Sequence, residues 1–156
     1  MQIKKLTSII IILFILSTVT PVLGLQNPGM AKVLLKAEKP DSSGLFTATL
    51  TVHDATFNAF QFAFSYDADT VIPVNKNGQP AVSFSDCGTA VESVSSWMSP
   101  IGNKLDVQKE LLECGGYVNP GRGNITADAS GIVLYEFTFR KTGTAPVTIR
   151  LAAEAS

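Results

Sequence analysis

The stretch NAFQFAFSYDADTVIPV, residues 58–74, carries the clearest structural pattern in this chain. Four aromatic residues alternate there with four small or polar ones. The aromatic set is Phe60, Phe62, Phe64 and Tyr66, and the other set is Ala59, Gln61, Ala63 and Ser65. Because successive side chains of a strand leave opposite faces, the pattern predicts a strand with a buried aromatic face and a smooth outward face.

Short strand-like segments separated by turn residues make up most of the remaining chain. Alternation is strong in 45–52 and 131–140, and further strands are predicted at 32–38, 70–74, 81–85, 90–98 and 145–152. Residues 103–114 favour a short helix stopped by Gly115, or else a strand that leads into GGYV. About eight short strands with turns at spacings of roughly 8–12 residues predict an all-β antiparallel sandwich or barrel.

The N-terminal segment has the layout of a secretory signal peptide. Lys4 and Lys5 precede the apolar run 9–16. Val22 and Gly24 are the small residues at positions −3 and −1 of a predicted cleavage site after Gly24. The apolar stretch is short against the roughly 20 residues of a membrane-spanning helix, which disfavours an uncleaved anchor. We therefore predict a signal peptide at 1–24, a flexible leader at 25–31, and one secreted, extracellular domain at 32–153.

The charge balance argues against nucleic acid and anionic membranes as partners. The chain holds 12 basic and 13 acidic residues, and Lys4 and Lys5 lie in the predicted signal peptide, so the remainder has a net charge of −3. No basic cluster is left that would attract a polyanion.

The two cysteines, Cys87 and Cys114, suit a disulfide in an oxidising compartment. The alternative is a pair of free, buried thiols, because sequence spacing alone does not show whether the two Cα atoms lie close enough for a bond.

Catalytic and metal-binding patterns are weak. The single histidine, His53, stands next to Asp54, but no nucleophile motif such as Gly-x-Ser-x-Gly accompanies it, so we predict that the protein is not an enzyme. Asp67 and Asp69 offer oxygen ligands of the kind calcium prefers, although two such carboxylates equally suit the capping of a turn. Turn capping is the favoured interpretation, and neither a metal site nor a cofactor is predicted.

Three stretches together resemble cohesin domains. FQFAFSYDADTVIPV (60–74) is similar to the third-strand region of that family, and NITADASGIVLYEFTFRKTGTAPVTIRL (124–151) to its last two strands. GLFTATLTV (44–52) fits the same layout upstream, whereas residues 86–118 match poorly. The resemblance implies a nine-stranded jelly-roll sandwich that docks a calcium-loaded dockerin on one flat sheet.

The smooth face of the opening strand would then be the partner-binding surface. The resemblance places Ala59, Gln61, Ala63 and Ser65 on that face, where small side chains allow a protein partner to approach closely. Dockerin-binding cohesins tend to carry Asn and Asp where this chain has Ala59 and Gln61.

Two other functions compete with docking. A sandwich of this kind can bind polysaccharide through exposed aromatic rings, and Trp97 and Tyr117 are the residues outside the expected core strands that suit stacking on sugars. The remaining alternative is a structural surface domain without a ligand.

Overall fold

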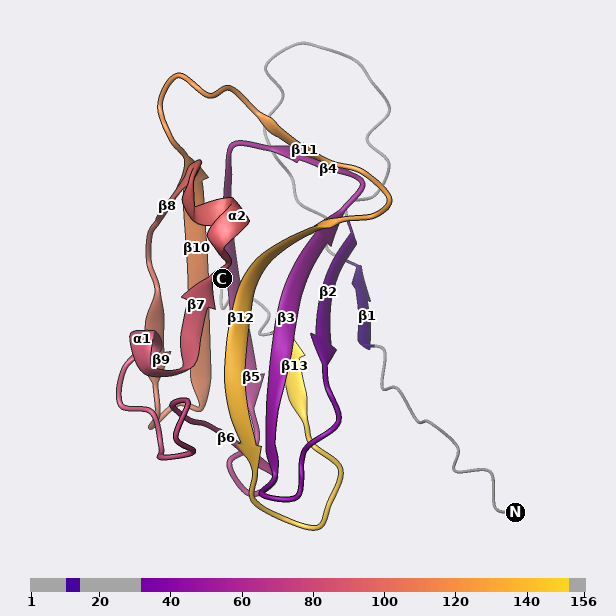
Figure 1. Ribbon diagram of the computed structural model, residues 1–156. Helices are drawn as coiled ribbons and strands as arrows, with labels where there is room; N and C mark the ends of the chain where they lie inside the picture. The colour runs from indigo at the N-terminus through magenta and orange to yellow at the C-terminus, as the bar shows by residue number, and fades with distance from the viewer. Residues whose placement is uncertain (1–10, 15–31, 152–156) are drawn as a thin grey trace, which may run out of the picture.

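The computed structural model describes residues 11–14 and 32–151, which form two antiparallel sheets packed face to face (Figure 1). The first sheet has the order β1 (Ile11–Phe14), β2 (Lys32–Ala37), β3 (Leu45–His53), β12 (Ile132–Lys141) and β6 (Val71–Pro73), with β7 (Gly88–Ala90) also paired to β12. The second sheet has the order β13 (Ile149–Leu151), β5 (Ala59–Tyr66), β10 (Leu111–Val118) and β8 (Met98–Pro100), with β9 (Lys104–Asp106) also paired to β10.

One two-stranded ribbon and two short helices complete the sandwich. β4 (Ala55–Phe57) and β11 (Ile125–Ala127) form a two-stranded ribbon across one end, at the top of Figure 1. The helices α1 (Phe84–Cys87) and α2 (Glu92–Ser95) are single turns in the connection between β6 and β8. The predicted all-β antiparallel sandwich is confirmed, with more and shorter strands than the nine expected from the resemblance.

The core follows the alternation of the strands. In β3 every second residue is buried, and the buried set is Phe46, Ala48, Leu50 and Val52. Phe64 of β5 meets Phe137 of β12 edge to face, with ring centroids 6.1 Å apart, so aromatic rings join the two sheets.

A bulge interrupts the predicted alternation of β12. Val133 lies opposite Thr51 and Tyr135 lies opposite Leu50, which leaves Leu134 as an extra residue. Leu134 and Tyr135 are consequently both fully buried, although strict alternation would place them on opposite faces.

Two predicted strands are wrong because local hydrogen bonds favour turns. Residues 81–85 lead into α1, where the carboxylate of Asp86 accepts the backbone N–H groups of Val82 and Ser83 at 3.0 and 2.9 Å. Residues 90–98 contain α2, whose first turn is closed by bonds to the carbonyl oxygen of Val91.

The helix predicted for residues 103–114 is also wrong, and the alternative strand is correct. β9 and β10 pair with each other across the turn 107–110. The Asp106 carboxylate accepts the backbone N–H of Lys109 at 3.1 Å, and Glu110 adopts a φ of 52°, which reverses the chain.

The predicted disulfide is absent, since both cysteines are free and buried. The Cys87 Sγ lies 3.5 Å from the carbonyl oxygen of Phe84, toward its own helix. Cys114 lies opposite Phe62 in the centre of the second sheet and is fully buried there. The alternative of two buried thiols therefore describes the structure.

The N-terminal predictions are not tested by the fold. β1 falls inside the predicted signal peptide and pairs with β2, while residues 25–31 lie outside the described residues. Among the described residues, no helix has the length and apolar character needed to cross a membrane.

Candidate functional site

The orientation predicted for β5 is confirmed. Phe64 and Tyr66 are buried at 3% and 5% exposure. Phe60 and Phe62 are half-buried and pack against the same core. On the opposite face Ala59 and Gln61 are exposed, and the remaining two outward residues, Ala63 and Ser65, are half-buried.

The neighbouring strand β10 extends this smooth surface. Residues opposite each other in antiparallel strands share a face, and the register pairs Ala59 with Tyr117, Gln61 with Gly115, Ala63 with Glu113 and Ser65 with Leu111. These eight residues are called the β5–β10 face below. The β5 half of this face has two alanines and a serine, so a partner's backbone can approach the sheet closely along β5.

Gly115 lies in the middle of the β5–β10 face because a larger residue does not fit. A Cβ atom there would stand 2.8 Å from the carbonyl oxygen of Ile101 and 2.9 Å from that of Phe60. The Gly115 carbonyl oxygen also accepts the backbone N–H of Ile101 at 3.1 Å. The segment 101–103 is thereby held against β10 between β8 and β9.

A buried hydrogen-bond network supports Gly115 from inside the sandwich. Tyr135 reaches across the core from β12, and its hydroxyl donates to the Gly115 carbonyl oxygen at 2.8 Å. Asn103 accepts the Gly115 N–H at 2.9 Å and donates to the Tyr135 hydroxyl at 3.1 Å. Burial raises the pKa of Tyr135, so its hydroxyl stays protonated at neutral pH and remains a donor.

Exposed apolar side chains surround this smooth centre. Tyr117 on β10 is 41% exposed, Ile101 beside Gly115 is 58% exposed, and Val107 after β9 is 55% exposed. Apolar side chains near an interface centre gain most when a partner covers them.

Charged groups gather at the end of the face where β9 lies. Lys104, opposite Glu113, forms an ion pair with Asp106 at 3.5 Å, and Lys109 approaches the same carboxylate at 3.9 Å. The backbone N–H of Lys109 and the two ammonium groups hold the pKa of Asp106 below its ordinary value. The β5–β10 face therefore combines an uncharged row of β5 residues with charged groups on β10 and β9, among them Glu113 and the Asp106 cluster.

The two residues predicted to stack on sugars differ in exposure. Trp97 is half-buried and packs against Phe57 at a centroid distance of 6.4 Å, as part of the core margin. Tyr117 is exposed on the β5–β10 face. Their predicted role in sugar stacking stays a prediction.

The weak catalytic and calcium patterns have structural explanations. The Nδ1 atom of His53 lies 3.1 Å from the carbonyl oxygen of Ala129, which ties the end of β3 to the loop after β11. The Asp67 carboxylate accepts the N–H of Asp69 at 3.0 Å, as expected of a turn cap. Within the described residues, no three potential metal-ligating side chains lie together.

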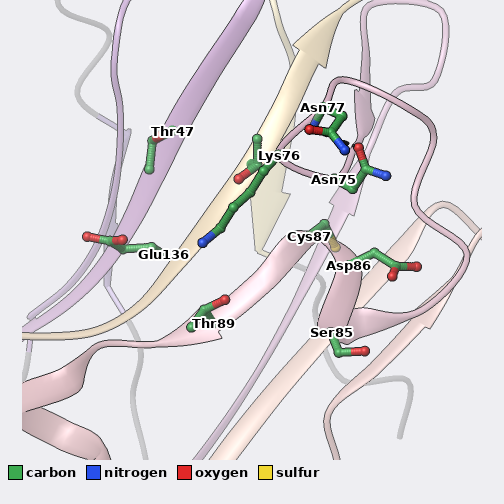
Figure 2. Close-up of a pocket in the computed structure, with 10 residues that line it drawn as sticks. Thr47, Asn75, Lys76, Asn77, Ser85, Asp86, Cys87, Thr89 and Glu136 are labelled. Carbon is green, nitrogen blue, oxygen red and sulfur yellow. Dashed lines mark hydrogen bonds between the residues drawn. The ribbon is translucent and has the colours of Figure 1, made fainter.

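Sequence reasoning missed a second candidate site, an open depression of about 580 Å³ at the outer face of the first sheet (Figure 2). Nine of its ten lining residues have polar or charged side chains, and the full set is Thr47, Asn75, Lys76, Asn77, Ser85, Asp86, Cys87, Thr89, Glu136 and Thr138. These residues come from β3, β12, β7, α1 and the turn after β6. The sequence signal that points to it is the outward set of polar residues, namely the alternating threonines of 45–52 together with Glu136 and Thr138.

Solved structures with the same fold are type II cohesins from Acetivibrio cellulolyticus. A chain of a cohesin–X-dockerin complex superposes with a TM-score of 0.57 at 17% identity, covering 78% of this chain and 77% of that chain. The second cohesin module of an adaptor scaffoldin superposes with a TM-score of 0.61 at 16% identity, covering 78% of this chain and 70% of that chain. No family model and no curated protein sequence matches the chain. The chain therefore has a cohesin-like fold, as its sequence indicates.

Proposed function

We propose that this domain is a non-catalytic docking module whose β5–β10 face binds a dockerin-type protein in an extracellular polysaccharide-degrading or cell-surface assembly. The observation that carries the proposal is the row of uncharged, mostly small side chains along β5 on the outside of the second sheet. The likeness to cohesins, one of them solved in a complex with an X-dockerin, supports it.

Close approach is the physical basis of binding in this proposal. Ala59 and Ala63 leave the backbone of β5 within reach of a partner helix, and Gln61 adds a polar group that donates and accepts hydrogen bonds. Exposed Ile101 and Tyr117 supply apolar area at the edge of this centre. Such rigid anchors contribute most of the affinity in typical interfaces.

The substitutions relative to dockerin-binding cohesins define the expected specificity. By the resemblance, Asn and Asp of those domains correspond to Ala59 and Gln61, so the side-chain amide is lost at Ala59 and a carboxylate is replaced by an amide at Gln61. We therefore expect a partner whose contact helix is more apolar than the partners of those cohesins. Complementary chemistry at a buried interface centre sets partner choice.

The substitution Ala63→Arg tests the proposal. A long side chain there would hold a partner away from the sheet and so weaken binding. The fold should tolerate the change, because Ala63 faces outward and the new guanidinium would stand opposite Glu113. Calorimetry against a panel of calcium-loaded dockerins measures the affinity, and thermal unfolding measures the stability.

Ala145→Arg is the matched control, since Ala145 is exposed in the loop before β13. Lost dockerin binding in Ala63→Arg, with binding kept in Ala145→Arg and both melting temperatures unchanged, supports the docking face. Equal affinities in the two variants, or a wild type that binds no dockerin in the panel, would contradict it.

A further inference from the structure

The outer face of the first sheet carries a ladder of hydroxyl groups around one carboxylate. Glu136 of β12 lies between Thr49 of β3 and Thr89 of β7 in the strand register. One step along β12, Thr138 lies opposite Thr47. These side chains form the floor of the polar depression, except for Thr49, which donates to the carbonyl oxygen of Lys36 instead.

The turn at 75–79 forms a rigid wall above this floor. The Asn75 side chain accepts the backbone N–H groups of Asn77 and Gln79 at 2.9 and 3.0 Å. Arg140 of β12 donates to the carbonyl oxygen of Gly78 at 2.6 Å, which fixes the turn to the sheet. This wall is therefore already ordered before a ligand binds, so binding does not incur the entropy cost of ordering a loop.

The opposite wall is α1, which contributes Ser85, Asp86 and the buried Cys87. The Asp86 carboxylate is engaged in capping its own helix. Phe84 anchors the helix to the core through edge-to-face contacts with Tyr135 and Phe137, at centroid distances of 5.7 and 6.0 Å.

Several polar groups in the depression remain available to a ligand. Figure 2 shows Lys76 extending from the turn over the sheet, in the direction of Glu136 and Thr89. Lys76 and Glu136 nevertheless form no ion pair within the described part of the chain. An ammonium group, a carboxylate and the threonine hydroxyls are thus presented together to solvent on a preformed surface.

We propose that this depression binds a neutral, polyhydroxylated ligand, namely a short stretch of a polysaccharide. Its volume of about 580 Å³ lies within the roughly 300–1,000 Å³ of typical ligand sites. Vicinal sugar hydroxyls both donate and accept hydrogen bonds, so they suit the mixture of Glu136, Lys76 and threonine hydroxyls.

The same residues argue against other ligand classes. One ammonium group faces two carboxylates, Glu136 and Asp86, which disfavours phosphates and acidic sugars. Glu136 of the floor lies on β12, which is paired on both sides at this point, so a peptide cannot join that strand as a neighbour. The lining holds no aromatic ring, and we therefore expect dissociation constants in the millimolar range.

The site is independent of the docking face, which belongs to the other sheet. A polysaccharide-binding depression on the first sheet would let the domain hold a glycan on one side and a protein partner on the other. The inference stands on the depression alone and does not depend on dockerin binding.

An NMR titration of the isotope-labelled chain with cellotetraose and xylotetraose tests the site, with tetragalacturonate as the acidic comparison. We expect saturable shifts of the backbone amides at 75–77, 88–90 and 136–138 with at least one neutral sugar. Replacing Glu136 by Ala, or Lys76 by Met, should weaken binding by about tenfold or more, because hydrogen bonds to charged groups are the strong ones.

The matched controls are Glu113→Ala on the second sheet and Lys39→Met in an exposed turn. Both should bind as the wild type does, and so should Ala63→Arg. The proposal is overturned if no neutral sugar gives saturable shifts, or if the shifts centre on Trp97 and Tyr117. Tighter binding of tetragalacturonate, or unchanged affinity in the Glu136 and Lys76 variants, would refute it as well.

Discussion

Replacing Phe64 by Ala should remove a large part of the stability of this domain. The Phe64 ring is 3% exposed and meets Phe137 edge to face at a centroid distance of 6.1 Å. Its cross-strand neighbour Leu112 is 1% exposed, so the cavity left by the ring would be enclosed. A truncation of this kind costs about 3–5 kcal/mol, of which the aromatic pair contributes roughly 0.5–1.5 kcal/mol.

Urea unfolding followed by fluorescence measures this cost, with the single tryptophan, Trp97, as the reporter. Typical domains have free energies of unfolding of about 5–15 kcal/mol, so the variant should stay folded in water but unfold at much lower urea concentration. The outward neighbour Gln61 provides the control, because Gln61→Ala should change the free energy of unfolding by no more than about 0.5 kcal/mol. A loss below about 1 kcal/mol for Phe64→Ala, or equal losses for the two variants, would refute the orientation of β5.

Three further outcomes follow from buried or capped groups. Burial raises the pKa of the Cys87 thiol to about 12 and also raises the pKa of the Cys114 thiol. A thiol reagent should therefore react slowly with the native protein and should titrate two thiols after unfolding. If it titrated none after unfolding, the two cysteines would be joined in a disulfide. Tyr135→Phe removes the hydroxyl that accepts from Asn103, and should lower the free energy of unfolding by about 1–3 kcal/mol in the same urea assay; an unchanged value would contradict the network. Backbone N–H groups hold the pKa of Asp86 below its ordinary 3.8, so the stability that the carboxylate adds is present above that pH and is lost as the pH falls through the folded-state pKa. Asp86→Asn should therefore be less stable than the wild type at neutral pH and approach it in acid; a constant difference across this range would refute the linkage.

The parts of the fold that sequence predicts correctly are those with a strict two-residue period. Residues 45–52 and 60–66 alternate without interruption, so both their strand character and their buried faces follow from the pattern. The bulge at Leu134 shows where the pattern fails, because one extra residue shifts the phase without leaving a signal in the composition.

The wrong secondary-structure predictions fall where local hydrogen bonds, between residues close in sequence, outweigh the pattern of apolar residues. Residues 81–85 look like a strand, but the carboxylate of Asp86 captures two backbone N–H groups and begins a helical turn instead. In 103–114 the apolar spacing fits a helix, yet Glu110 turns the chain and two strands pair across it. Such side-chain-to-backbone bonds depend on conformations that residue spacing does not specify.

The candidate sites differ in how far the sequence reveals them. The β5 half of the β5–β10 face follows from the alternation within one strand, so its outward residues can be predicted from sequence. The β10 half cannot, because the sequence does not show which β10 residues pair with β5. The polar depression joins residues as distant in sequence as Thr47 and Thr138, and only the folded sheet brings them together.

The central claim, that the outer face of the second sheet receives a protein partner, is tested most directly by cross-saturation NMR on a complex with a bound dockerin. Irradiating the partner attenuates the signals of residues that it touches. The docking proposal predicts attenuation at 59–65 and 111–117, with the strongest effect around Ala59, Gln61 and Ala63. Attenuation confined to the first sheet, at 45–52 or 132–138, with these residues unaffected, would contradict it.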